Sequence, residues 1–244
     1  MKTFSSFSAL VVMFVGLIGL APSPASAQLH PFEIGEKLVY LTMFNFVKSG
    51  QSTMEILGQE IIDGHAIYRV RSQTQTAPFF DKLYRIRDDM ESWIDVKTLF
   101  SRRFQKKLAE GNYRKEYAVR FDYQKMQAIS ATDIDTLTSM VHDPLSIFYF
   151  LRAESLYVGR IFKLFNYDND KLKPYNIIVK RIEKVNVPAG EFVCFVLEPF
   201  SKDGKLFKHQ SQVTIYVSTD ERHLPVMISS DASIGKMILR LEKF

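Results

Sequence analysis

Alternating hydrophobic and polar positions run through most of the chain and predict an all-β protein. The alternation is cleanest at residues 113–123, where Tyr117, Val119 and Phe121 face one way and charged residues the other. Similar runs, separated by the turn signals Ser49-Gly50, Asp63-Gly64 and Asp203-Gly204, predict further strands. In chain order the predicted strands are residues 36–47, 51–57, 66–71, 84–94, 99–108, 113–123, 161–166, 175–184, 192–198, 213–218, 226–230 and 237–242.

One stretch between the two β-rich halves predicts a short helix instead. Asp143 is a good N-cap residue, and Pro144 suits the first helical position because its missing N–H costs nothing there. Leu145, Phe148 and Leu151 then recur at three-residue spacing. A helix of about ten residues is not stable alone, so its aromatic face must pack on the sheet.

Roughly a dozen antiparallel strands and one short central helix predict one of two shapes. The first is a strongly curved open sheet, half-barrel-like, whose concave side the helix partly covers; the second is a closed, lipocalin-like barrel. No repeat or linker-like composition divides residues 28–244, so we expect a single β-rich domain. Its one cysteine, Cys194, cannot form an internal disulfide, and the fold must therefore rest on its core.

Residues 1–27 have the pattern of a secretory signal peptide. Lys2 supplies a positive start, residues 9–21 form an uncharged apolar run, and Ala25-Ser26-Ala27 is a cleavage site. The apolar run is shorter than the roughly 20 residues that a membrane-spanning helix needs. We therefore expect cleavage after Ala27 and a periplasmic mature chain without a transmembrane span.

The charge of the chain does not indicate a nucleic-acid-binding protein. The net charge is +5, and it falls to +4 when the signal peptide with its single lysine is removed. The basic residues are interleaved with acidic ones, and export also argues against a nucleic-acid partner. A mildly basic protein can favour an anionic surface, although solubility alone accounts for this charge.

The sequence contains no motif that predicts an enzyme, a metal site or a cofactor. The five histidines lack metal-binding spacing, and neither a G-x-S-x-G motif nor a phosphate-binding glycine loop is present. His142 is the most interesting of them, because it lies beside Asp143 and near Ser146. With Ser139 as a further candidate, these residues could be assembled into a hydrolytic triad, but an ordinary polar residue beside a helix cap is the far commoner explanation of His142.

Aromatic side chains are unusually abundant, with 20 phenylalanines and 11 tyrosines. They can fill the interior of a small barrel or line a cleft for an apolar ligand. Arg102 and Lys106 share a predicted strand face with Phe100 and Phe104, either at the rim of the sheet or on a cavity wall that meets an anionic group. If the rings line a cleft, we expect Arg102, Lys106 or Arg152 near its mouth, where it can meet a headgroup. The candidate ligand-binding residues are Phe100, Arg102, Phe104, Lys106, His142, Asp143 and Arg152.

Several short stretches, in this order and spacing, together resemble a known family. They are residues 31–38, 79–84, 88–92, 143–152, 187–194 and 220–226. The combination resembles the bacterial exported family catalogued as domain of unknown function 3108, over nearly the whole mature chain. The resemblance implies an envelope protein of Gram-negative type with a curved antiparallel sheet or barrel. It implies no activity and no catalytic residue.

Three hypotheses of function follow, in order of preference. The first is a non-enzymatic periplasmic protein that binds an apolar or lipid-like component of the cell envelope. The second is an interaction module that docks on an envelope assembly, with another envelope protein as partner. The third is an envelope hydrolase built around His142, which requires a pocket at the start of the helix.

Overall fold

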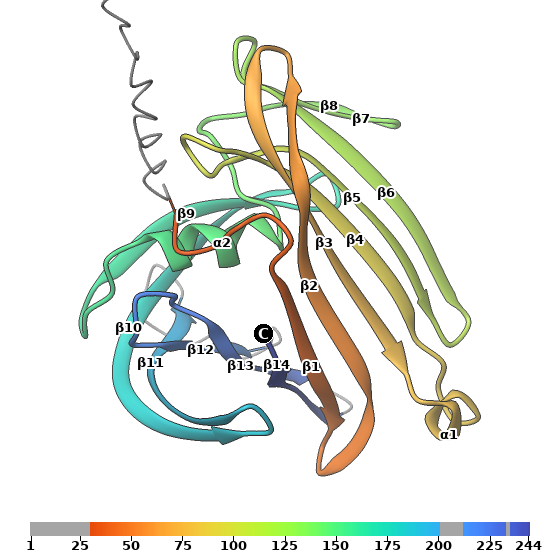
Figure 1. Cartoon of the computed structure of the whole chain (residues 1–244). Helices are drawn as coiled ribbons and strands as arrows, with labels where there is room; N and C mark the ends of the chain where they lie inside the picture. Colours follow the sequence, from red (N-terminus) through yellow and green to blue (C-terminus); the bar gives the residue numbers. More distant parts are fainter. Residues whose placement is uncertain (1–29, 201–211, 233–234) are drawn as a thin grey trace, which may run out of the picture.

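The chain folds into one curved sheet of fourteen antiparallel strands with two short helices (Figure 1). The computed structural model describes residues 30–200, 212–232 and 235–244. The helices are α1 (Pro78–Asp81) and α2 (Ser146–Ala153). The strands are β1 (Lys37–Phe44), β2 (Val47–Ile62), β3 (His65–Thr76), β4 (Arg87–Asp95), β5 (Ser101–Glu110), β6 (Tyr113–Asp122), β7 (Gln127–Ser130), β8 (Ile134–Thr136), β9 (Ile161–Tyr167), β10 (Leu172–Val187), β11 (Gly190–Phe200), β12 (Gln212–Ser218), β13 (Pro225–Ala232) and β14 (Gly235–Lys243).

Neighbouring strands in the sheet are neighbours in the chain, with one exception. The order is β8-β7-β6-β5-β4-β3-β2-β1-β14-β13-β12-β11-β10-β9. The first and last strands therefore pair in the middle of the sheet, while β8 and β9 form its two edges. The sheet curls without closing, which confirms the predicted all-β fold and selects the curved open sheet of the two predicted shapes.

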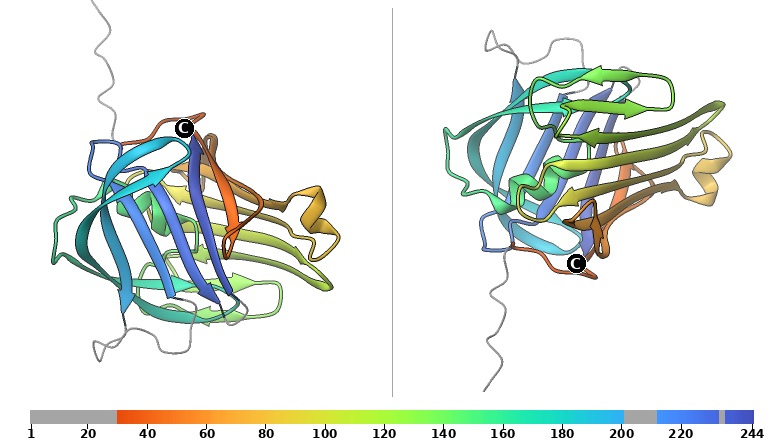
Figure 2. Two further views of the ribbon diagram at one scale, coloured as in Figure 1. Left: turned by 90° about the horizontal axis from the view of Figure 1, so that it is seen from below. Right: turned by 90° about the horizontal axis from the view of Figure 1, so that it is seen from above.

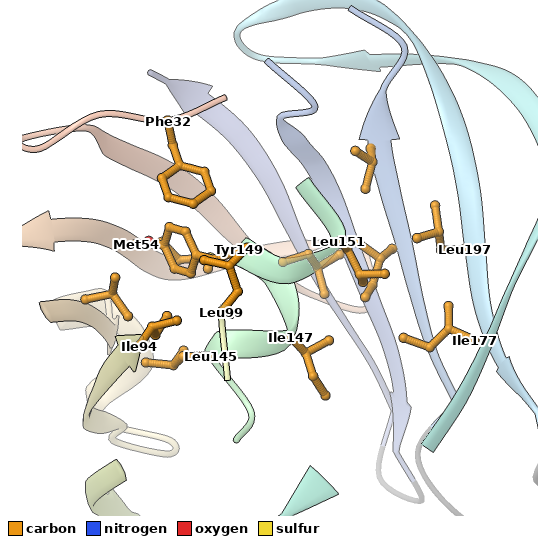
Figure 3. Packing of buried hydrophobic residues seen from close by; sticks show 14 of the residues in the cluster. Phe32, Met54, Ile94, Leu99, Leu145, Ile147, Tyr149, Leu151, Ile177 and Leu197 are labelled. Atoms are coloured by element: carbon orange, nitrogen blue, oxygen red, sulfur yellow. The ribbon is translucent and has the colours of Figure 1, made fainter. Parts of the chain in front are cut away.

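Helix α2 lies inside the curl of the sheet, as the sequence predicted (Figures 1 and 2). Its buried side chains include Ile147, Tyr149 and Leu151. Figure 3 shows them between Ile94 from the first half of the sheet and Ile177 from the second, all in one hydrophobic cluster. The helix thus joins the apolar inner faces of both halves into one core, which neither half could bury alone.

The start of α2 is stabilised by Asp143, as predicted, although the helix begins later than expected. The helix begins at Ser146, and Pro144 lies in the turn before it. The Oδ1 atom of Asp143 accepts hydrogen bonds from the backbone N–H groups of Leu145 at 2.7 Å and Ser146 at 2.9 Å. The carboxylate therefore satisfies two N–H groups that the first turn leaves without helical partners.

The turn between β1 and β2 corrects the sequence prediction of one strand over residues 36–47. The strand ends at Phe44, and the chain reverses at Asn45, which adopts a left-handed conformation with φ of 53°. The expected turn at Ser49-Gly50 is wrong, because both residues lie within β2. Gly50 is needed there for close packing, since a Cβ atom would lie 2.1 Å from the Gln75 carbonyl oxygen. A glycine inside a strand can mark such an approach as well as a turn.

Other boundaries differ from the predictions where the pattern is short. Strands β7 and β8 and helix α1 were not predicted, because four residues or fewer carry too little periodicity. The predicted turn at Asp63-Gly64 is confirmed, and both residues have positive φ. The predicted signal peptide and the turn signal Asp203-Gly204 lie outside the described residues.

Candidate functional site

The concave face of the sheet has an open end that α2 does not cover (Figure 1). Half-buried apolar side chains line this end. Leu239, Tyr175 and Val213 each lie two residues nearer the open end than a fully buried residue of the same strand, and residues two apart share a face. Met90 and Tyr117 have the same relation to the buried positions of β4 and β6. These five residues, together with Leu172, are called the open-end apolar set.

An ion pair at this open end links the two halves of the sheet across the gap that the sheet leaves unclosed. The Lys106 Nζ of β5 lies 2.6 and 2.7 Å from the two carboxylate oxygens of Asp168, in the turn that joins β9 to β10. Beside it, the Tyr117 hydroxyl donates to the Asp170 carboxylate at 3.1 Å. The backbone N–H of Asp170 in turn donates to the Tyr117 hydroxyl oxygen. A second hydrogen bond crosses directly between the edge strands, from the Tyr167 hydroxyl to Asp135 at 2.5 Å.

The turn itself is shaped to reach across the gap. Asn169 and Asp170 both adopt positive φ, 52° and 53°, which gives the tight two-residue hairpin that matches the twist of antiparallel strands. Asp168 and Lys171 close the hairpin through two backbone hydrogen bonds of 3.2 Å. Asn and Asp tolerate this conformation better than other non-glycine residues. This tight hairpin places Asp168 opposite Lys106.

Carboxylates offset the positive charge of Lys106 at the open end. Besides Asp168 and Asp170, Glu110 approaches from β5 and Asp88 from β4. Partial burial raises the pKa of Glu110 above its usual range, and the negative charge of Asp88 adds a smaller effect in the same direction. Lys106, the cation that the sequence predicts for the ligand site and that lies at this end, is thus already paired with acidic neighbours.

Arg102 lies away from the open end and is also paired. The strand register shifts between Trp93 and Ile94, and Arg102 falls at this irregularity opposite them. Its guanidinium donates to the Asp95 carboxylate at 2.9 and 3.2 Å. Burial opposes ionisation of Asp95, but hydrogen bonds from Arg102 and from the backbone outweigh it and lower the pKa of this carboxyl. Because of this register shift, Arg102 does not share a strand face with Lys106, although the sequence predicts that it does.

Phe100, His142 and Asp143 come together beneath the start of α2. The imidazole of His142 is fully buried between the rings of Phe100 and Phe150, whose centroids lie 4.8 and 4.7 Å from it. Burial lowers the pKa of His142 to about 3, so the ring is neutral at physiological pH. Asp143 is buried too, and this desolvation raises its pKa, although Ser92 and the helix N–H groups donate to it.

Arg152 is held at the other end of α2. Its guanidinium forms two hydrogen bonds with the Glu36 carboxylate, at 2.5 and 2.8 Å, and lies over the rings of Phe32 and Tyr149. It also donates to the backbone carbonyl of Pro31. Only 2% of the Arg152 side chain is exposed, and this position differs from the expected one at the mouth of a cleft.

The structure therefore divides the seven predicted site residues among four places. Phe104 and Lys106 lie on the concave face, Phe100, His142 and Asp143 lie under the start of α2, and Arg102 and Arg152 each lie in a separate ion pair. Sequence reasoning missed the residues that the second half of the chain contributes to the open end. Tyr175, Val213 and Leu239 lie within predicted strands, but only the curl of the sheet brings them opposite β4 to β6.

Two further properties bear on what the site can do. Among residues 30–200, 212–232 and 235–244, no three His, Cys, Asp or Glu side chains are grouped so that they could hold a metal ion. Neither helix in these ranges has the length and apolarity needed to cross a bilayer.

Solved structures resemble this chain in fold. A β-barrel-like protein of domain of unknown function DUF1849 from Brucella abortus aligns with a TM-score of 0.54 at 11% sequence identity, over 85% of this chain and 95% of that one. A DUF1089 family protein from Pseudomonas aeruginosa aligns with a TM-score of 0.38 at 10% identity, over 75% of this chain and 91% of that one. At these identities the first likeness concerns the fold alone.

Curated proteins gave no match to the sequence. A family model, described as a protein of unknown function (DUF3108), matches residues 38–242, which is most of the chain and confirms the resemblance drawn from the short motifs. The chain belongs to the DUF3108 family of proteins of unknown function.

Proposed function

We propose that this protein binds an apolar, lipid-like component of the cell envelope at the open end of its concave face, without catalysing a reaction. The observation that carries the proposal is the open-end apolar set. Six apolar side chains from both halves of the sheet converge there, and the part of the chain that the structure describes covers them only partly. An apolar ligand would remove them from water, at about 25 cal/mol for each Å² of surface covered.

The ion pairs around the site limit what the ligand can offer. The guanidinium groups of Arg102 and Arg152 already bind carboxylates with two hydrogen bonds each. Lys106 is held by Asp168. An anionic headgroup would have to displace one of these carboxylates, so the proposed recognition depends on the apolar part of the ligand.

The export signal supports the assignment to the envelope. Residues 1–27 carry the features of a cleaved signal peptide, and the family resemblance points to an exported protein. We place the mature chain in the periplasm on this basis.

The test is native mass spectrometry of the mature protein purified from its own periplasm, followed by identification of extracted lipids. We expect a stoichiometric apolar ligand, or binding of envelope lipids by delipidated protein. The paired variants Leu239→Gln and Ile238→Gln change neighbouring residues on opposite faces of β14. Leu239→Gln should lower occupancy several-fold, and Ile238→Gln should leave it unchanged. A ligand-free mass that persists after incubation with envelope lipids would overturn the proposal.

The hydrolase hypothesis receives less support from the geometry. His142 is 0% exposed, so a substrate would have to displace Phe100 or Phe150 to reach its imidazole. The buried ring fits a structural role better, since it fills the space beneath α2.

A further inference from the structure

Three turns lie together at the open end of the sheet and form one protruding rim (Figures 1 and 2). They are residues 44–48, which span the end of β1 and the start of β2, residues 77–86 around α1, and residues 110–115, which span the end of β5 and the start of β6. The Ala77 N–H donates at 2.8 Å to the carbonyl of Ser49, the residue that follows the first turn. The Gly111 N–H donates to the Arg85 carbonyl at 2.8 Å, which joins the second turn to the third.

The docking rim, as we call these three turns, exposes large apolar side chains. Phe46 is 96% exposed, Phe79 73% and Leu83 72%. Tyr84 and Tyr113 are exposed as well, and the Tyr84 ring lies against Gly111, where a Cβ atom would come within 2.6 Å. A turn does not require exposed apolar side chains, because polar residues form turns equally well.

The same rim carries an excess of positive charge. Its cations are Lys48, Lys82, Arg85, Arg114 and Lys115, and its two carboxylates are Asp81 and Glu110. Within the described residues none of the five cations lies within 4 Å of a carboxylate, and Arg114 donates only to backbone carbonyls. Asp81 is bound to Arg87 from the neighbouring strand. These three turns thus hold more than half of the net charge of +5 of the whole chain.

We propose that the docking rim binds the surface of a bilayer that contains anionic phospholipid. Apolar side chains at the tips of the turns would enter the boundary between headgroups and acyl chains, where tyrosine is also favoured. The unpaired cations beside them would remain at the level of the headgroups and attract their negative charge. Exposed apolar side chains flanked by cations are thus complementary to an anionic bilayer surface, and we infer this partner from that complementarity.

The shape of the rim also favours a membrane over a folded protein. The apolar side chains stand on three separate projecting turns, and a fluid surface can accept each tip independently. A protein partner would need a matching cavity for each one and an acidic surface around it. The inference goes beyond the proposed ligand site, since either can hold without the other.

Vesicle co-sedimentation tests the proposal with the mature chain and two kinds of vesicle. We expect binding to vesicles of phosphatidylcholine mixed with phosphatidylglycerol, weaker binding to phosphatidylcholine alone, and release by salt. Phe46→Ser/Leu83→Ser should reduce the partition coefficient about tenfold or more. Ile61→Ser, at the far end of β2 and 71% exposed, is the matched apolar control and should bind normally.

Charge reversal tests the electrostatic part separately. Lys82→Glu/Arg85→Glu should reduce binding to the anionic vesicles at least tenfold, because each cation near such a surface contributes about fivefold. The control Lys97→Glu/Lys125→Glu makes the same change of charge in turns at the opposite end of the sheet. Failure to bind anionic vesicles, or equal loss in rim and control variants, would overturn the proposal.

Native mass spectrometry separates this inference from the proposed ligand site. Rim variants that lose vesicle binding but retain the co-purifying ligand would support both proposals. Vesicle binding by a protein whose interior takes up no lipid would leave the rim proposal standing alone.

Discussion

Arg152 and Glu36 join the helix to the sheet through two hydrogen bonds. The Nη1 and Nη2 atoms of Arg152 lie 2.5 and 2.8 Å from the two carboxylate oxygens of Glu36. The two residues are 116 positions apart, and Glu36 directly precedes β1, at the centre of the sheet. The pair therefore fixes α2 against the strand that joins the two halves.

Removing either partner should destabilise the fold, but unequally. Glu36→Gln leaves the guanidinium of Arg152, 2% exposed, without its counter-charge, and we expect a loss of about 3 kcal/mol in the free energy of unfolding. Arg152→Met leaves Glu36, which is 16% exposed and better placed to regain water, so its cost should be smaller. Urea unfolding of the single and double variants measures this coupling. Additive effects would show that the pair contributes nothing as a pair.

His142 should make the protein sensitive to acid. Its folded pKa of about 3 lies below the ordinary value of 6.5, so the unfolded chain binds the proton more readily between these values. The stabilisation is complete above pH 6.5 and falls by about 1.4 kcal/mol per pH unit as pH decreases towards 3.

Substitution of the imidazole tests this dependence directly. His142→Leu should flatten the slope of unfolding free energy against pH between pH 6 and pH 4, whatever its effect on absolute stability. Urea unfolding at a series of pH values provides the measurement. A slope equal to that of the parent protein would show that another group causes the acid sensitivity.

The ion pair across the gap should control local opening at the edge of the sheet. Asp168→Asn leaves Lys106 with a side chain only 7% exposed, whereas Lys106→Met leaves Asp168 at 23%. We expect Asp168→Asn to cost about 3 kcal/mol and Lys106→Met clearly less. Amide hydrogen exchange of β9 should accelerate more in Asp168→Asn. The reverse order would contradict the burial of Lys106.

Cys194 should be chemically inert while the protein is folded. Its side chain is fully buried in the core, and this burial raises the pKa of the thiol to about 12. Because the thiolate is the reactive form, a thiol reagent at pH 8 should label the native protein slowly and the urea-unfolded protein at once. Rapid labelling under native conditions would indicate that β11 opens.

The sequence could predict the elements with long periodic patterns, and it failed where one residue type has two uses. Alternation in residues 113–123 correctly marked Val119 and Phe121 as inward-facing. The Ser49-Gly50 pair predicts a turn, but Gly50 serves close packing against Gln75. The signal that could have located the true turn is Asn45, which tolerates positive φ.

The candidate site was harder to predict, because cations on apolar faces have two explanations that look the same in a sequence. The sequence indicates ligand-binding roles for Arg152 and Arg102, and the structure shows each of them bound to a carboxylate, from a distant segment for Arg152 and from a neighbouring one for Arg102. Glu36 gave no sign of this role, since it stands 116 positions from Arg152. The half-buried state of Leu239 and Tyr175 likewise depends on how far the sheet curls, which local pattern does not encode.

The pairing of β1 with β14 has a consequence for how the molecule is made. The strands before and after α2 can form successive hairpins as they emerge, yet the two sets join only through the final nine-residue strand. The pairing in the centre of the sheet therefore cannot form until β14 has been synthesised, and until then β1 presents an open edge to other chains. A circular permutant that links the present termini and begins at β9 would form all fourteen strands in consecutive order. It should refold faster and aggregate less than the natural chain.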